Sequence, residues 1–148
     1  MRIGSKNKSG ILVGLQMVWI FFLLVRIPFL YSDLWAYLVS IAGMLLGAWA
    51  VFSMKLDNVR IIPDVKQDAR LVMAGPYKVI RHPMYSSVLL MFLPFALDKP
   101  SLYMNTIFLM LLATLLIKLN YEETMLKTHF KEYEEYSKHS WRLIPFIY

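Results

Sequence analysis

The chain has 148 residues, enough for one domain, and 58% of them are hydrophobic. Its mean hydropathy of +0.50 is too high for an ordinary soluble domain. The absence of cysteine excludes disulfides, thiolate metal sites and a cysteine nucleophile. The net charge of +6 could indicate a nucleic-acid partner, but apolar runs explain it better, because basic residues of membrane proteins gather on the cytoplasmic side. We therefore expect an integral membrane protein and no nucleic-acid partner.

The first two apolar segments are long enough to cross a bilayer. A basic start resembles that of a signal peptide, but no small-residue cleavage site follows, so we expect a retained helix over 11–31. The second segment, 34–54, contains no charge and carries Gly43 and Gly47 four residues apart. Such a pair lets another helix approach closely. It is either a seam between two copies of the chain or ordinary packing within one chain, and we favour packing because the spacing is common.

Two further apolar segments, 84–97 and 101–120, follow a long charged connection and predict a helical hairpin with Ser101 as a helix cap. The first leg is short for a span. Beyond it the pattern becomes amphipathic, and we expect the helix to continue to about Tyr136, with Glu123 and Lys127 as a surface ion pair. The predicted fold is all-α, a single domain over 1–148. It is an integral membrane bundle of about four transmembrane helices plus an amphipathic cytoplasmic C-terminal helix.

The distribution of basic residues predicts the orientation of this multi-pass protein. With four spans and a cytoplasmic N-terminus, both termini are cytoplasmic, and only Arg26 and Lys99 of the 16 Lys and Arg residues fall outside the cytoplasmic side. This asymmetry fits the positive-inside rule. The same orientation brings the segments 69–85 and 118–142 to one face of the membrane.

The stretch that organises the chain is LVMAGPYKVIRHPMY, at 71–85, a polar and conformationally restricted segment between two apolar regions. Its Gly-Pro pair indicates a turn, and Pro83 disfavours a helical conformation for His82. Lys118 and Glu122 share a helix face at the membrane boundary, where an acidic residue commonly faces a cavity or a partner. Spacing alone leaves two alternatives open for Glu122: it holds a ligand, or it is solvated as the helix leaves the membrane.

Other kinds of site have no support in the sequence. His82 alone is more simply a helix-entry residue than a base, and His129 and His139 are expected at the surface. No close pair of histidines predicts a zinc site, so we expect no metal. Neither a Rossmann fingerprint, nor a P-loop, nor a nucleophile elbow occurs.

The segment GPYKVIRHPMY is followed, after the hairpin, by Tyr121-Glu122-Glu123, by F-x-x-Y-x-x-Y and by RLIP at 142–145. Together these motifs resemble the isoprenylcysteine carboxyl methyltransferase family, whose broader relatives include the membrane phospholipid N-methyltransferases. The resemblance covers roughly residues 62–148. It implies a membrane enzyme that uses S-adenosyl-L-methionine without a Rossmann fold. The cofactor-binding residues that it implies are Ala69, Arg70, Leu71, Val72, Tyr77, His82, Pro83, Met84, Tyr85 and Glu122.

The resemblance also suggests the reaction. It implies O-methylation of a carboxylate on a lipidic or isoprenyl-linked substrate, a reaction that needs alignment more than a strong base. Lys118 stands where many members have an arginine near the substrate carboxylate, and Lys118 or Arg81 would hold the anionic group. Phospholipid or amine N-methylation, an NADPH-dependent reduction and a non-catalytic scaffold remain alternatives. The expected partners are a lipidic or prenylated small molecule and membrane lipid, and a second copy through Gly43 and Gly47 is the less favoured alternative to packing within one chain.

Overall fold

The computed structural model describes residues 3–25, 31–54, 71–98 and 100–148, and this part of the chain is helical without strands. One isolated bridge, between Ile80 and Trp141, is present there. The predicted all-α class is therefore confirmed. The elements in chain order are α1 (Ile3–Val25), α2 (Leu34–Met54), the 3-10 helix η2 (Gly75–Lys78), α3 (Pro83–Leu97), α4 (Leu102–His129) and α5 (Tyr133–Lys138).

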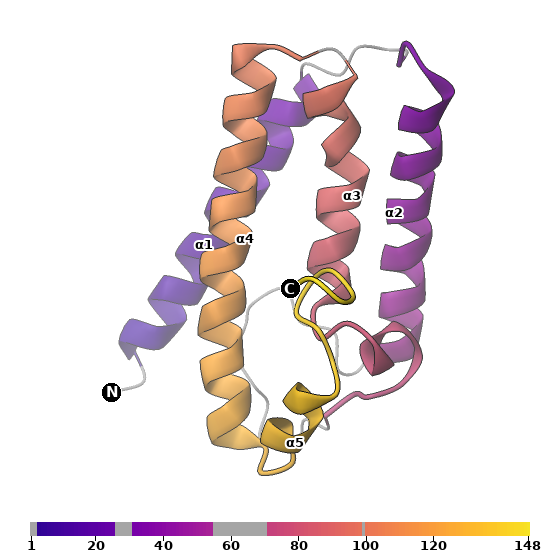
Figure 1. Cartoon of the computed structure of the whole chain (residues 1–148). Helices are drawn as coiled ribbons and strands as arrows, with labels where there is room; N and C mark the ends of the chain where they lie inside the picture. The colour runs from indigo at the N-terminus through magenta and orange to yellow at the C-terminus, as the bar shows by residue number, and fades with distance from the viewer. Residues whose placement is uncertain (1–2, 26–30, 55–70, 99) are drawn as a thin grey trace.

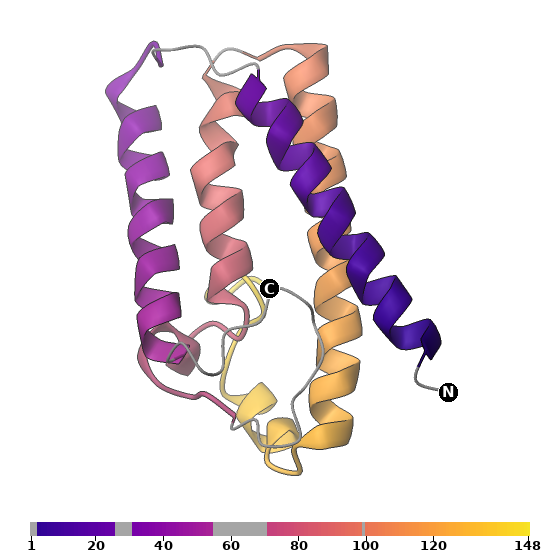
Figure 2. The ribbon, with the colours of Figure 1, turned by 180° about the vertical axis from the view of Figure 1, so that it is seen from behind.

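The long helices lie beside one another in the order α1, α4, α3, α2, which differs from their order in the chain (Figures 1 and 2). The N-terminal half of α1 diverges from the other helices in both views. The start of α1, η2, α5 and the C-terminal end of α4 lie at the same end of the bundle (Figure 1). We call this the site end, because the polar residues singled out in the sequence gather there.

Within the described ranges, three helices are long and apolar enough to cross a membrane: Asn7–Val25, Leu34–Met54 and Leu102–His129. The fourth, α3, has only 15 residues, as its short apolar run predicted. Large apolar side chains on α2 are exposed, Phe52 by 82%, as expected for a surface that faces lipid. The first helix begins at Ile3, earlier than the predicted start at 11, and the end of that prediction falls outside the described residues.

The last long helix ends sooner than predicted. It stops at His129 instead of running to Tyr136, because Phe130 adopts an extended conformation (φ −113°, ψ 117°). The chain turns there and starts α5 at Tyr133, whose side chain is 1% exposed. A straight continuation would carry this ring past the end of the bundle, whereas the turn buries it. The C-terminal segment therefore folds back over the site end (Figure 1).

Close packing joins α2 to α3. A Cβ atom added at Gly43 would lie 2.6 Å from the backbone nitrogen of Met91, and one at Gly47 would lie 3.0 Å from Ser87 Oγ. Ser40 Oγ donates to the carbonyl of Met91 at 3.1 Å. The face carrying the two glycines is thus covered by α3 of the same chain, which is the packing that the sequence favoured.

Side-chain caps fix the opposite end of the bundle. Ser101 Oγ accepts from the backbone nitrogen of Met104 at 3.1 Å, which confirms the predicted cap of α4. Asp98 accepts from the backbone nitrogens of Ser32 at 2.8 Å and Asp33 at 3.3 Å, just before α2. A carboxylate at a helix N-terminus is favourable for the helix dipole, so Asp98 ties α3 to the start of α2.

Candidate functional site

A glycine turn starts the site. Gly75 has φ +58°, and a Cβ atom there would lie 2.1 Å from Ser53 Oγ of α2, so only glycine fits. Pro76 follows in the first turn of η2, and Pro83 opens α3 directly after His82. Proline is favoured at the first helical position because it has no N–H to leave unpaired. The two prolines therefore delimit a short segment between α2 and α3.

The C-terminal segment pairs with this short segment. The backbone nitrogens of Arg81 and His82 donate to the carbonyls of Trp141 at 2.7 Å and Arg142 at 3.1 Å. Ser86 Oγ donates to the carbonyl of Leu143 at 2.6 Å, and Leu143 is buried. Residues about sixty positions apart are therefore joined through backbone groups, which places the RLIP motif against the start of α3.

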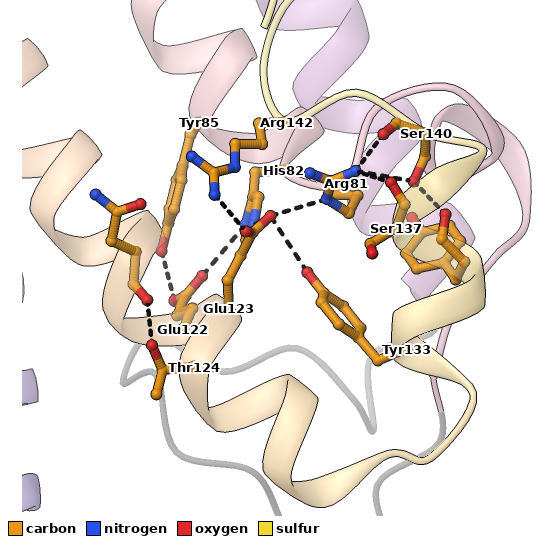
Figure 3. A network of polar contacts seen from close by, with 12 residues as sticks. Arg81, His82, Tyr85, Glu122, Glu123, Thr124, Tyr133, Ser137, Ser140 and Arg142 are labelled. Atoms are coloured by element: carbon orange, nitrogen blue, oxygen red, sulfur yellow. Dashed lines mark hydrogen bonds and ion pairs between the residues drawn. The ribbon is translucent and has the colours of Figure 1, made fainter.

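Glu123 is the centre of an ion-paired cluster (Figure 3). Its carboxylate lies 2.8 Å from Arg81 Nε and 3.1 Å from Arg142 Nη2, and Tyr133 Oη donates to it at 3.4 Å. Arg81 also donates to the carbonyls of Ser137 and Ser140. The cluster thus joins α4, the segment before α3 and the C-terminal segment.

This cluster corrects one prediction. Glu123 does not form a surface pair with Lys127, because its side chain is only 6% exposed and faces two arginines. Contacts with distant segments decide which face of α4 is buried at this position. The local i,i+4 spacing carries no information about those contacts. His129 and His139 are exposed as predicted, and His139 pairs with Glu135 at 3.0 Å.

Glu122, the neighbouring carboxylate, has different partners. It accepts from Tyr85 Oη at 2.5 Å and lies 3.5 Å from His82 Nδ1. Its side chain is 22% exposed, and among the described residues no arginine or lysine lies within ion-pair distance of it. Of these two adjacent glutamates, Glu123 is therefore enclosed in the ion-paired cluster, whereas Glu122 is more exposed.

His82 lies between these carboxylates and is buried. Its Nε2 atom is 3.5 Å from Glu123 Oε1 but makes no hydrogen bond there. Burial alone would lower the pKa of His82, but the carboxylates of Glu122 and Glu123 outweigh it, so the pKa is raised. The ring is therefore held in its protonated form to higher pH than a free histidine.

Tyr77 contributes a hydroxyl without a partner. Its side chain is 5% exposed, and its Oη atom makes no hydrogen bond with the described residues. Burial, followed by the nearby Tyr136 and Glu122, raises the pKa of Tyr77. A buried polar atom without a partner needs an explanation, and a ligand atom is one that suits this position.

Lys118 reaches the same region from one turn earlier on α4. It is 5% exposed, and its ammonium donates to Gln16 Oε1 of α1 at 3.0 Å. The ammonium also lies 5.1 Å from the centroid of the Tyr85 ring. The Tyr85 side chain thus contacts Lys118 with its ring and Glu122 with its hydroxyl.

Most of the predicted site residues meet at the site end. Those brought together by direct contacts or shared electrostatics are Tyr77, His82, Tyr85, Lys118 and Glu122, with Arg81 in the Glu123 cluster. Pro83 is fully buried, while Leu71, Val72 and Met84 are half-buried. Ala69 and Arg70 lie outside the described residues.

The sequence reasoning missed three residues of this region. Tyr133 and Arg142 stand in recognised motifs, and those motifs were the available signal for the Glu123 cluster. Gln16 had a weaker signal, a polar side chain inside an apolar helix. Its partner could not be named because α1 and α4 are 102 residues apart at this contact.

Comparison with known proteins identifies the family. The family model described as phospholipid methyltransferase matches residues 32–133, more than half of the chain. The chain belongs to the phospholipid methyltransferase family. The match spans α2, η2, α3 and α4 and includes His82, Lys118 and Glu122. No curated protein and no solved structure matches the chain.

This result confirms the coarser part of the resemblance, a family of membrane methyltransferases related to both branches named from the sequence. The isoprenylcysteine branch stays a prediction. The matched range ends before Arg142 and begins after α1, so Gln16 and the closing RLIP motif belong to the unmatched parts of the chain.

Proposed function

We propose that this protein is an integral membrane methyltransferase that uses S-adenosyl-L-methionine and acts on a lipidic acceptor. The observation that carries the proposal is the meeting of His82 and Tyr85 with Glu122 at one end of the bundle, in a chain of this family. These side chains come from the two segments that the sequence resemblance assigned to one cofactor.

The donor set suits the cofactor. S-adenosyl-L-methionine carries an ammonium, ribose hydroxyls and a sulfonium. A partly exposed carboxylate can accept hydrogen bonds from the ammonium and the hydroxyls, and its negative charge can offset the positive charge of the sulfonium. Glu122 is such a carboxylate, and the unpartnered hydroxyl of Tyr77 adds a donor or acceptor nearby. Tyr77, His82 and Glu122 would therefore hold the cofactor, with Tyr85 fixing the Glu122 carboxylate.

When bound, this cofactor supplies an electrophilic methyl group. The residues of the chain orient the reactants and exclude water, and orientation of this kind accounts for much of the rate in group transfer. Arg81 and Glu123 neutralise each other and join three segments, so they support the site instead of touching the reacting atoms. A carboxylate acceptor is already ionised at neutral pH and needs no base.

For the acceptor we propose a carboxylate on a lipidic or isoprenyl-linked molecule, giving a methyl ester. The supporting observation is the buried Lys118 ammonium, whose hydrogen bond is to the neutral Gln16. An anionic group on the acceptor would accept the remaining N–H donors of the Lys118 ammonium. The alternative is N-methylation of a phospholipid amine, which the name of the matching family favours. Arg81 is a weaker candidate for the acceptor anion because Glu123 already pairs with it.

We also propose that the site end faces the cytoplasm, with both termini on that side, as the basic residues predict. The chain has no cysteine, so single cysteines report orientation cleanly. In intact cells or sealed right-side-out vesicles, Lys138→Cys should resist an impermeant maleimide and Asp33→Cys should react. The reverse pattern would contradict this orientation.

Cofactor use is tested by calorimetric titration of S-adenosylhomocysteine into purified protein. Glu122→Ala and His82→Ala should remove binding and leave the protein folded in detergent. Glu135→Ala is the matched control, since this exposed carboxylate lies at the same end and contacts only Lys138 and His139 among the partners described. Normal binding by both site variants would refute the assignment. A parallel titration with NADPH tests the reductase alternative.

The acceptor is tested with a radiolabelled methyl donor. Transfer to an S-prenylated cysteine derivative should give a base-labile methyl ester, while transfer to phosphatidylethanolamine should give a base-stable N-methyl group. Release of the label as methanol after alkali supports O-methylation. Retention of the label in the non-volatile head group, which alkali releases from the acyl chains without breaking the N-methyl bond, would support the N-methyl alternative instead.

A further inference from the structure

Two polar contacts attach α1 to α4 inside otherwise apolar segments. Gln16 Oε1 accepts from Lys118 Nζ at 3.0 Å, and Trp19 Nε1 donates to Thr114 Oγ1 at 3.0 Å. Trp19 and Thr114 are both neutral, and their contact needs no further partner. The first contact is different, because it leaves a charged group with a neutral acceptor.

The partners of Lys118 are incomplete. An ammonium has three N–H donors, and Gln16 takes one of them while the Tyr85 ring lies 5.1 Å away. Among the described residues no carboxylate lies within 4.0 Å of Lys118 Nζ. A lysine that is 5% exposed and makes no direct ion pair is costly in a membrane, whereas leucine or methionine would pack there without that cost.

Gln16 has the right chemistry to orient this ammonium and leave its charge intact. A glutamate in its place would form an ion pair and neutralise Lys118. An amide oxygen accepts one N–H and leaves the positive charge available to a ligand. The contact also comes from α1, which packs chiefly on α4, so Lys118 and Gln16 meet between these two helices.

We propose that Gln16 is a positioning residue that holds Lys118 as the binding group for an anion, a carboxylate or a phosphate, on the lipidic acceptor. The proposal rests on the proposed function and adds to it a contribution from α1, which lies outside the family match. The charge of the acceptor is then selected between α1 and α4, one helical turn from Glu122 and on the other side of the Tyr85 side chain that contacts both.

The test compares charged and uncharged lipids by calorimetric binding, which needs no turnover. The probes are N-acetyl-S-farnesyl-L-cysteine with its methyl ester, and dodecyl phosphate with dodecanol. In wild-type protein saturated with S-adenosylhomocysteine, the acid of at least one pair should bind about tenfold or more tightly than its uncharged counterpart, as for other buried charge pairs. The pair that shows this preference distinguishes a carboxylate from a phosphate.

Substitutions at Gln16 distinguish a role in positioning Lys118 from a role that only attaches α1 to α4. Gln16→Glu should abolish the preference for the acid while its thermal midpoint equals or exceeds that of the wild type, because an ion pair replaces a neutral contact. If the contact only attached α1, this variant would keep the preference. Gln16→Leu should weaken acid binding without changing binding of the uncharged probe. Trp19→Phe, which removes the neutral contact alone, should keep the wild-type preference.

Two results would overturn the proposal: equal binding of acid and uncharged probe by the wild type, or an unchanged preference in Gln16→Glu. Its failure is distinguishable from failure of the proposed function. If S-adenosylhomocysteine does not bind, the proposed cofactor use fails, while the same lipid titrations without it still test the pairing of Lys118 with an anion.

Discussion

Replacing Glu123 by glutamine removes the carboxylate that two arginines share and leaves the side chain almost unchanged in size. Arg81 then keeps a guanidinium whose side chain is 9% exposed without its counter-ion. Breaking a buried ion pair by removing one partner costs about 3–5 kcal/mol. Arg142 is 32% exposed, so its pair adds about 1 kcal/mol at most. Arg81 retains the carbonyls of Ser137 and Ser140, which favours the lower end of the range.

The expected loss is therefore about 3–4 kcal/mol of unfolding free energy, measured by denaturation in mixed detergent micelles. Glu122→Gln is the matched control on the next residue. It removes the charge next to one hydroxyl and one histidine, so the loss should be about 0.5–1.5 kcal/mol.

Ligand binding should show the opposite pattern. Glu122→Gln should lose most of its affinity for S-adenosylhomocysteine, while Glu123→Gln, at a temperature where it is folded, should retain affinity within a few fold. Equal destabilisation by the two substitutions would refute the division of roles between these neighbours. So would a greater loss of affinity in Glu123→Gln.

Three further outcomes are expected. Because the pKa of His82 is raised on folding, its protonated ring stabilises the folded protein fully below about pH 6.5. This stabilisation is lost as the pH rises through the folded-state pKa. The thermal midpoint of the wild type should therefore fall over that pH range, and it should fall less in His82→Gln. Gly43→Ala should destabilise by about 1–3 kcal/mol because its Cβ meets the α3 backbone, whereas Gly14→Ala, with open space around it, should be neutral or stabilising in the same denaturation assay. Tyr85→Phe should weaken S-adenosylhomocysteine binding in calorimetry, but less than Glu122→Gln, because only one hydrogen bond to the carboxylate is lost; an effect as large as that of Glu122→Gln would give Tyr85 a direct ligand role.

The helices were predictable because their signal is local. Apolar run lengths predicted α2 at its observed bounds and placed the start of α3 at 84, one residue after the observed start at Pro83. The meeting of the RHP segment with the glutamates was also predicted, since charge asymmetry assigned both to one face. That prediction is met by the 3.5 Å contact between His82 and Glu122.

The rest depends on long-range packing. Successive residues on a helix point about 100° apart, and nothing local to Glu122 and Glu123 says which one turns inward. Distant arginines decide it. The end of α4 carries no glycine or proline, so local propensity favours continuation, and burial of Tyr133 overrides it. The contact of Gln16 with Lys118 requires the order of helices in space, which the sequence pattern does not contain.

The most direct measurement is the heat released when S-adenosylhomocysteine is titrated into the purified wild-type protein and into Glu122→Ala. We expect saturable binding by the wild type with one ligand per chain, and no binding by the variant. A folded wild-type protein that takes up no ligand, or a variant that binds as the wild type does, would contradict the claim that these two segments form a cofactor site.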